Sequence, residues 1–541
     1  MLSFTQSFIY KAALIFAAIY VIYLLVFKDK GKNKIIYLLI ITFLTFLIKL
    51  PYFFIGELNP DEGEWMTIVK IWNADFNPYI NNDPHTTGII GLMPLYLFDK
   101  LIPLHYSTIR IVGTLFDLIT IFLTYRILLP HLKQNKKLLF IALAVLYCML
   151  NISNEKDFIA YNTEHLCILV FTLLVYILQK MGILFKVVEQ NETTQQRLFL
   201  LLLAGLLMGS SLFIKLQNIP AIFILFCFTF YHFLKNKKYK DLVLLILFCL
   251  LPAFFILSAL YLNGSINDFY TRYILTNLDY SGRGLNYAFI DPQLYEPSRF
   301  KIQSIYPFLI VLCLVFLLII TNTEKVKKAI FNQNFLFFLI ILLIAIIEVR
   351  QPKTYLQHYY LLLYQPLIPL FICLKNFELR KNIFLSILAF QFLYFWVFKL
   401  KDKSTLLYAA GEQDLYTKIT SDIKSKAELN NCDDKNILVW GWNSRYYVYG
   451  RFLPVTRDFV NVHLFIHEDF LERYYLHSFI SDVQRNNNKK ILVIDDLQRQ
   501  KRFKLYKFPE FIDHYNLSKH FNKLTMVEHN DQYDTYVMEL F

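Results

Sequence analysis

Long apolar runs, separated by short polar segments, dominate the first three quarters of the chain. A membrane-spanning helix needs about 20 mainly apolar residues, within a range of roughly 17–25. The runs predict spans at residues 8–27, 35–55, 108–129, 138–152, 163–178, 198–214, 219–234, 242–262, 305–320, 335–347, 358–374 and 383–398. The pattern therefore indicates a multi-span α-helical membrane protein of about 12 helices over residues 1–399. The first run lacks a basic leader and a small-residue cleavage site, so we expect a helix rather than a cleaved signal.

The pattern changes after residue 399. Residues 400–541 alternate helix-like polar stretches with two short β-rich runs, at 436–440 and 490–494. Short runs of this kind, bounded by turn-forming or charged residues, are typical of strands. The sequence therefore predicts a C-terminal soluble α/β domain over residues 400–541.

The composition supports a membrane protein. Of 541 residues, 56% are hydrophobic and 18% are charged, whereas soluble globular proteins have roughly 45–50% apolar and about 25% charged residues. This excludes a disordered chain, a coiled coil and a secreted disulfide scaffold. All cysteines except Cys432 lie in apolar runs, and no Cys/His spacing suits a zinc ion. The sequence therefore predicts neither intramolecular disulfides nor structural zinc.

The formal net charge is +13, but the basic residues do not cluster as a nucleic-acid-binding face requires. Instead, 20 of them lie in alternate short loops, whereas the opposite set of loops, which includes 56–107 and 263–303, holds nine. The positive-inside rule assigns the basic loops to the cytoplasm. We therefore expect a multi-pass protein of the bacterial inner membrane, with its long loops and C-terminal domain extracytoplasmic and with no nucleic-acid partner.

The first long loop carries Asp61 and Glu62 directly after a predicted span. A carboxylate at the membrane surface can take a proton from an acceptor hydroxyl, or hold an ion against a phosphate. The same segment also fits a helix start, with Asn59 as N-cap, Pro60 at N1 and acids in the first turn. The two interpretations are compatible because a capped helix holds a base rigidly.

The order of motifs resembles a known family. The pair Asp61-Glu62 after an early span, a His/Pro segment at 82–88 and a predicted interfacial helix at 89–101 are similar to the GT-C glycosyltransferases, especially the protein O-mannosyltransferases and the aminoarabinose transferases acting on lipid A. Later motifs follow in the family's order: Tyr161 to Glu164, Ala204 to Gly209 leading to Lys215, His358-Tyr359-Tyr360, and Val439 to Trp442. Two features depart from the family pattern: Thr86-Thr87 stand where two prolines often occur, and helix 8–27 is additional.

The resemblance implies an inverting membrane glycosyltransferase. It would move a sugar from a polyprenyl-phosphate donor to a hydroxyl of a lipid, glycan or protein acceptor on the outer face. The implied catalytic residues are Asp61 as general base, with Glu62 and Glu164 orienting the acceptor or the base. The implied donor-phosphate ligands are Lys215, His85, Arg350, Lys353, His358 and Tyr359. We expect no cofactor and no metal ion, because the relatives closest in pattern mostly need none for catalysis.

Each of these residues also has a structural interpretation. Lys215 at the end of an apolar span could simply reach the interface along its apolar stem, and Arg350, Lys353 and His358 could only flank a span. Glu164 could complement a helix dipole. A further pair, Arg110 and Asp117, lies seven residues apart on one predicted helix, and we expect it to form an ion pair within the bundle.

Two other function classes stay open. A transporter or flippase for a lipid-linked glycan would need charged residues at mid-membrane, and apart from Asp117 the predicted spans hold few. A structural membrane protein could instead bind glycan through its C-terminal domain. The aromatic residues there could stack on sugar or pack in the core; they are Trp440, Trp442, Tyr446, Tyr447 and Tyr449.

Overall fold

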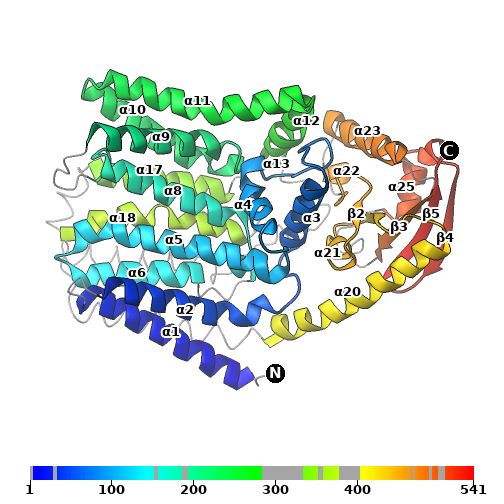
Figure 1. Ribbon diagram of the computed structural model, residues 1–541, viewed down its shortest axis with the longest axis horizontal. Helices are drawn as coiled ribbons and strands as arrows, with labels where there is room; N and C mark the ends of the chain where they lie inside the picture. Colours follow the sequence, from blue (N-terminus) through cyan, green and yellow to red (C-terminus); the bar gives the residue numbers. More distant parts are fainter. Residues whose placement is uncertain are drawn as a thin grey trace.

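The protein consists of a helical bundle with a smaller α/β domain at one end (Figure 1). The computed structural model describes residues 4–28, 33–151, 156–185, 193–282, 333–350, 357–376, 403–461, 463–466, 469–486, 490–497 and 506–541. The long helices of the bundle are α1 (Phe4–Phe27), α2 (Lys34–Phe53), α5 (Tyr106–Leu132), α6 (Lys136–Asn151), α8 (Thr163–Lys180), α9 (Thr194–Ser211), α10 (Ile219–Lys235), α11 (Tyr239–Leu262) and α17 (Gln333–Arg350). They run side by side along one axis, so the bundle has two distinct ends.

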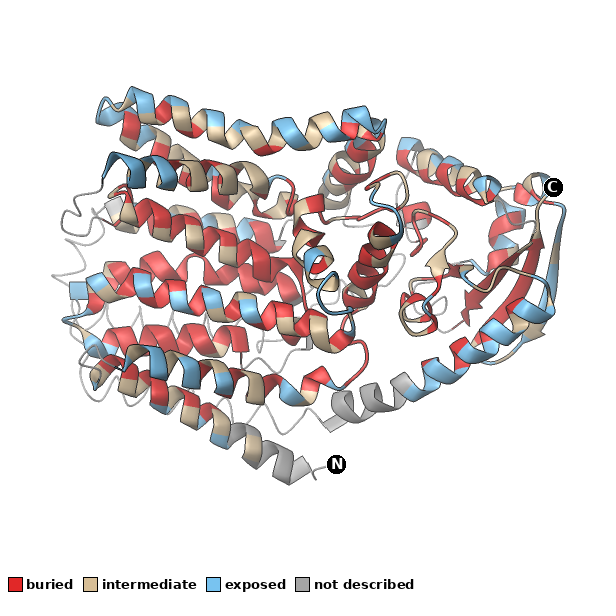
Figure 2. Ribbon diagram, viewed as in Figure 1, coloured by how far each residue is buried: buried red, intermediate tan, exposed pale blue. Residues whose placement is uncertain are grey.

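Five helical segments among the described residues are long and apolar enough to cross a membrane: Lys34–Phe53, Tyr106–Leu132, Thr163–Lys180, Leu216–Lys235 and Tyr239–Leu262. Figure 2 shows α6 and α8 largely buried, whereas α2 and α11 expose a face. That face is apolar, with Phe43 on α2 and Leu250, Phe254 and Phe255 on α11 all more than half exposed. Lipid-facing helix surfaces have this character, because hydrocarbon rather than water surrounds them.

Most of the predicted spans within the described residues coincide with one of these helices. The ranges 305–320 and 383–398 lie outside the described residues. The predicted span 358–374 is wrong as a single helix: it is a 3₁₀ helix (η5, Gln357–Tyr364), a short α18 (Leu367–Cys373) and a 3₁₀ turn (η6, Leu374–Asn376). Pro366 explains the break, since proline disfavours the helical conformation of the residue before it.

Arg110 and Asp117 are each paired inside the bundle, but not with each other as predicted. The predicted ion pair between Arg110 and Asp117 is wrong. Asp117 instead lies 2.8 Å from Nζ of Lys49 on α2 and 2.7 Å from Nδ1 of His165 on α8. Seven residues of helix span about 10 Å along the axis, so Arg110 and Asp117 face different neighbours.

The C-terminal domain contains a five-stranded sheet in the order β2-β1-β3-β5-β4. The strands are β1 (Asn436–Trp440), β2 (Leu453–Pro454), β3 (Lys490–Asp496), β4 (Lys523–His529) and β5 (Tyr533–Glu539); β2, β1 and β3 are parallel, and β5 and β4 are antiparallel to their neighbours. Both β-rich runs predicted from the sequence are strands. The boundary predicted at residue 399 lies outside the described residues.

Alternating side chains of β1 build two cores. Leu438 and Trp440 pack under α23 (Asp469–Arg485) and α25 (Phe508–His514), whereas Ile437 and Val439 face α20 (Lys403–Leu429) and α21 (Arg445–Gly450). This is the period-two pattern of a strand buried on both faces. In the aromatic cluster, Trp440, Tyr446 and Tyr447 are buried, which supports core packing for them; Trp442 and Tyr449 are partly buried.

The C-terminal domain packs directly on the bundle. It contacts α3 (Pro60–Ala74), next to α4 (Ile89–Asp99), at the end of the bundle where α2 finishes (Figure 1). Nε of Arg445 lies 2.9 Å from Oε1 of Glu57, and Nζ of Lys70 donates to the carbonyl of Phe452 at 3.0 Å. One apolar core runs through both parts without interruption. The domain is therefore held against this end of the bundle rather than loosely tethered.

Candidate active site

Asp61 lies at the first turn of α3, as the sequence predicts. Asn59 is the N-cap, and its side chain accepts a hydrogen bond from the backbone N–H of Asp61 at 3.1 Å. Pro60 occupies the first helical position, where a missing N–H has no cost. Asp61 is partly exposed, whereas the next residue, Glu62, is fully buried. The two adjacent acids thus have different environments.

Glu62 is paired with Arg110 of α5. Its carboxylate lies 2.7 Å from Nε and 2.5 Å from Nη2 of Arg110, and it also accepts backbone hydrogen bonds from Leu58 and Tyr161, each at 3.1 Å. Arg110 in turn donates to three carbonyls at the end of α2 and just after it. These contacts hold the start of α3 against the segment that leads into α8.

Four of the predicted site residues meet beside this junction. Nζ of Lys215 lies 2.5 Å from Oε1 of Glu164, and Nε2 of His358 is 3.9 Å from the same oxygen. Nζ of Lys215 also lies 5.1 Å from the centre of the Tyr359 ring. All four residues are buried. Glu164 lies in the first turn of α8, Lys215 follows α9, and His358 and Tyr359 belong to η5.

The segment that carries Lys215 is fixed by backbone contacts with α4. The N–H of Gly88 donates to the carbonyl of Ile214 at 3.0 Å, and the N–H of Ile90 donates to that of Phe213 at 2.8 Å. A Cβ on Gly88 would lie 2.2 Å from the Phe213 carbonyl oxygen. Only glycine permits this approach, so the His/Pro segment and the lysine segment form one unit.

The glycine motif before Lys215 has a packing role. A Cβ on Gly209 would lie 2.0 Å from the carbonyl oxygen of Cys249 on α11. Small residues let membrane helices approach this closely. The motif therefore sets the position of α9 along α11, and thereby the place where the chain turns toward Lys215.

Asp61 shares an electrostatic environment with this group. Burial raises the pKa of Asp61 from 3.8 to about 6; the positive charges of His358 and Lys215 oppose the increase, and Glu164 adds to it. A carboxylate whose pKa lies near the working pH is suited to general base catalysis. The arrangement can thus accept a proton at Asp61 and stabilise a negative charge at Lys215.

Of the other predicted phosphate ligands, His85 is the one whose side chain is described. Arg350 ends α17, but its side chain lies outside the described residues, as does Lys353. His85 contacts the C-terminal domain instead, with Nδ1 lying 2.5 Å from Nε2 of His463.

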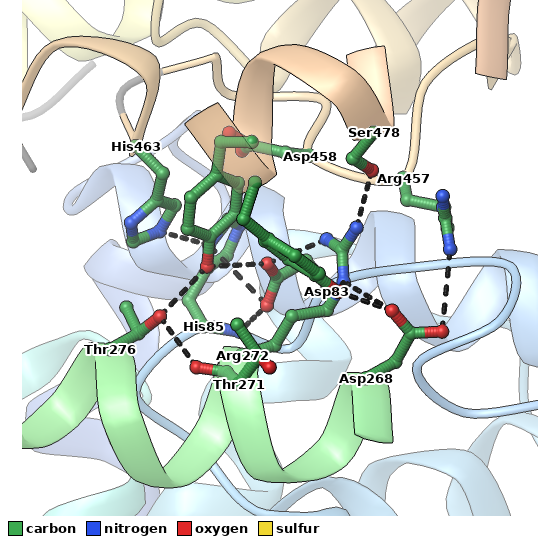
Figure 3. Close-up of polar contacts among 12 residues, drawn as sticks. Asp83, His85, Asp268, Thr271, Arg272, Thr276, Arg457, Asp458, His463 and Ser478 are labelled. Atoms are coloured by element: carbon green, nitrogen blue, oxygen red, sulfur yellow. Dashed lines mark hydrogen bonds and ion pairs between the residues drawn. The ribbon is translucent and has the colours of Figure 1, made fainter. Parts of the chain in front are cut away.

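A second polar network, next to His85, was not predicted from the sequence (Figure 3). Oδ2 of Asp83 lies 2.8 Å from Nη1 of Arg272 and accepts from the Tyr475 hydroxyl at 3.1 Å. Nη2 of Arg272 donates to Ser478 at 2.5 Å, and the backbone N–H of Asp83 donates to the carbonyl of Arg457 at 3.0 Å. These partners are 189 to 392 residues apart in the chain, so no local sequence pattern indicates them.

Comparisons with known proteins give a likeness of fold. No protein-family profile and no curated protein sequence matches the chain. Its structure is similar to ArnT from Cupriavidus metallidurans, solved bound to undecaprenyl phosphate and in the apo state, with a TM-score of 0.52, 11% identity, and coverage of 94% of this chain and 98% of that chain. It is also similar to the oligosaccharyltransferase of Archaeoglobus fulgidus in complex with Zn and sulfate, with a TM-score of 0.40, 8% identity, and coverage of 96% and 72%. The resemblance to aminoarabinose transferases that the order of motifs predicts is confirmed at the level of the fold by the likeness to ArnT.

Proposed function

We propose that this protein is a membrane glycosyltransferase. It transfers a sugar from a polyprenyl-phosphate donor to a hydroxyl of a lipid, glycan or protein acceptor, with inversion at the anomeric carbon. The supporting observation is the convergence of Lys215, Glu164, His358 and Tyr359 beside Asp61, at one end of an ArnT-like bundle. The named ligand of the similar structure, undecaprenyl phosphate, supports the donor class.

Asp61 is the general base in this proposal. The acceptor hydroxyl attacks the anomeric carbon while its proton passes to the Asp61 carboxylate. The new bond joins the acceptor oxygen to the anomeric carbon, and the bond from that carbon to the phosphate oxygen breaks. The electron pair leaves with the polyprenyl phosphate. The partial exposure of Asp61 is consistent with this role, because an acceptor can approach its carboxylate.

Lys215 stabilises the leaving phosphate. As the glycosidic bond breaks, negative charge develops on the bridging oxygen, and a buried ammonium interacts with it strongly because little water screens the pair. Without donor, the Glu164 carboxylate keeps the buried ammonium paired and fixes its position. His358 and Tyr359 border the same ammonium and complete the proposed phosphate site. We retain Arg350 and Lys353 as proposed further contacts of the donor, but not His85, whose ring lies against His463 of the C-terminal domain.

Glu62 has a different role from Asp61. Its carboxylate oxygens already accept hydrogen bonds from Arg110 and from two backbone N–H groups. It therefore acts as a positioning residue, which holds the helix start that carries Asp61 against the helix start that carries Glu164.

The proposal includes a membrane orientation. The short basic loops between α5 and α6 and between α10 and α11 lie at the bundle end opposite the C-terminal domain (Figure 1). By the positive-inside rule the basic end is cytoplasmic. The catalytic residues and the C-terminal domain would then be on the outer side of a bacterial inner membrane.

The decisive experiment is donor consumption by the purified protein. A panel of radiolabelled polyprenyl-phosphate sugars is offered to the parent, to Asp61→Asn and to a matched control, Asp75→Asn, which changes an exposed aspartate at the far end of the same helix. We expect the parent and D75N to consume one donor, and D61N to be slower by roughly 10²–10⁴-fold, the usual contribution of a general base. A normal rate for D61N would exclude the base, and a parent that consumes no donor would exclude the donor class.

One observation favours a transporter as the second candidate. Lys49, Asp117 and His165 form a charged group inside the bundle, where a transport pathway would need one. If the protein is a transporter, the Asp61→Asn variant should still move lipid-linked glycan across the membrane of proteoliposomes. The Asp117→Asn variant should not. If the protein is a glycosyltransferase, sugar transfer should be lost in D61N and retained in D117N, since only D61N removes a reacting group.

A further inference from the structure

A separate cluster of metal-binding residue types lies between the bundle and the C-terminal domain. It consists of His85, Asp458 and His463, whose ligand atoms all lie within 4.8 Å of one another. All three residues are buried, with exposed fractions of 4%, 7% and 5%. His85 belongs to the loop before α4, whereas Asp458 and His463 belong to the C-terminal domain (Figure 3).

The carboxylate of Asp458 lacks the partners that burial requires. Neither of its oxygens has a hydrogen-bond partner among the described residues, and both are buried. Nε2 of His85 makes no hydrogen bond to a described residue either, and Oε1 of Glu64 lies 3.5 Å from it. Leaving a buried carboxylate without a hydrogen-bond partner is unfavourable, so a cation bound directly to Asp458 would stabilise this site.

The two imidazoles are held with their nitrogens together. Nδ1 of His85 and Nε2 of His463 are 2.5 Å apart, and the rings are stacked with centroids 4.6 Å apart. The backbone of His85 has φ 53°, in the left-handed region that non-glycine residues seldom adopt. Its N–H donates to Oδ1 of Asp83 at 2.9 Å, which fixes this unusual conformation. Such strain is typical of ligand sites.

We propose that His85, Asp458 and His463 bind a divalent cation of the zinc type. Two imidazoles and one carboxylate are an established ligand set for Zn²⁺, which takes nitrogen and oxygen donors at close range. The cation supplies the charge that Asp458 lacks and separates the two ring nitrogens. The sequence predicted no such site because His85 lies 373 and 378 residues before the other two ligands, in the other part of the protein.

The position of the site defines its role. His85 is three residues before Gly88, whose N–H binds the carbonyl next to Lys215. A cation at His85 therefore joins the C-terminal domain to the loop that supports the lysine segment. Its role is structural, and it does not depend on the proposed glycosyl transfer.

A hydrogen-bonded cluster without a metal is the competing explanation. A proton shared between the two imidazoles, together with a protonated Asp458, would also lower the charge of the site. The two explanations differ in the metal content of the protein, which can be measured directly and without any assay of activity.

The test uses the purified full-length protein, stripped with a chelator and dialysed against Zn²⁺ or Co²⁺. Elemental analysis should find about one ion per chain in the parent, with the visible absorption of Co²⁺ in a nitrogen and oxygen ligand field. His463→Ala and Asp458→Asn should weaken binding by at least the roughly 10–100-fold seen when only an outer partner of a metal site is changed. His477→Ala, which removes an exposed histidine of α23, is the matched control and should retain the ion.

A second measurement does not require H463A or D458N to fold. Chelation should lower the thermal unfolding temperature of the parent and of H477A, and Zn²⁺ should restore it. A stripped parent that takes up no Zn²⁺ or Co²⁺ would overturn the proposal. Equal metal content in the parent, H463A and D458N would overturn it as well, because the bound ion would then lie elsewhere.

Discussion

Nζ of Lys215 lies 2.5 Å from Oε1 of Glu164, and both side chains are buried. The ammonium is thus held by a carboxylate from another helix rather than reaching out to the membrane interface. An ion pair of this kind has two separable effects, one on stability and one on function. Removing one partner leaves a buried charge alone, whereas removing both charges does not.

Lys215→Met is predicted to lose donor binding or turnover. It deletes a charge-assisted contact worth about 1.5–3 kcal/mol, which corresponds to roughly 10- to 150-fold in donor KM or kcat. The single variant should also be destabilised, by about 3–5 kcal/mol, because Glu164 stays buried without its partner. Kinetics with a polyprenyl-phosphate sugar and thermal unfolding measure the two effects.

The double variant Lys215→Met with Glu164→Gln separates the effects. It should recover most of the stability of the parent, since no lone charge remains, but none of the lost activity. Recovery of donor kinetics together with stability would mean that the pair only supports the fold, and would remove Lys215 from the phosphate site.

The pH dependence of the reaction should report Asp61. Since the pKa of Asp61 is raised to about 6, its carboxylate is protonated below that pH and cannot act as a base. We expect kcat/KM to fall as the pH decreases through about 6, whereas an ordinary aspartate would keep the rate constant to about pH 4. The donor is a phosphodiester and does not ionise in this range. A residual D61N rate that shows the same acid limb would assign the limb to another group.

Asp61 affects stability and reaction rate in opposite directions: as the pH rises, the rate increases but the contribution of Asp61 to stability is lost. Its folded-state pKa lies above 3.8, so the fold favours the protonated carboxyl. That contribution is complete below pH 3.8 and is lost as the pH rises through about 6. Asp61→Asn is therefore predicted to be at least as stable as the parent at neutral pH. Thermal unfolding of both proteins at several pH values tests this, and a clear loss of stability in D61N would mark Asp61 as a structural residue.

Glu62→Gln is predicted to act on the fold. It leaves the buried guanidinium of Arg110 without its carboxylate, which should destabilise the protein by about 3–5 kcal/mol. The matched control is Arg197→Gln, which removes a more exposed pair with Asp241 and should change stability by less than about 1 kcal/mol. Equal stability of the two variants would contradict the role given to Glu62.

The membrane orientation can be tested independently of the chemistry. A reporter fused after Lys403, at the start of α20, should behave as extracytoplasmic. A cytoplasmic reporter signal would invert the topology and put Asp61 on the wrong side for an outer-face reaction.

Part of the candidate site could be predicted from the sequence because its signals are local. The start of α3 follows from Asn59 and Pro60, and the order of motifs brings Glu164, Lys215 and His358 into one expected site. Their meeting in space is an observation of the structure. The partner of Arg110 could not be predicted in this way, since its carboxylate is 48 residues away in the chain.

The wrong or missing predictions have a common physical cause. A window of apolar residues measures hydrophobicity, but it does not register the backbone break at Pro366 that divides the range 358–374. Likewise, cysteine and histidine spacing finds only ligands that are neighbours in the sequence. His85 and His463 become neighbours only when the C-terminal domain packs on the bundle.

Because Gly209 contacts α11 so closely, the number of residues between this glycine and Lys215 decides where the Lys215 ammonium lies. With Gly209 fixed against the Cys249 carbonyl, a residue inserted within the last turn of α9 would advance the helix by about 1.5 Å and rotate the downstream segment by about 100°. The ammonium would then point away from Glu164. This stretch can thus vary in the identity of its side chains far more freely than in its length, and an insertion or deletion there would inactivate the protein more surely than most substitutions.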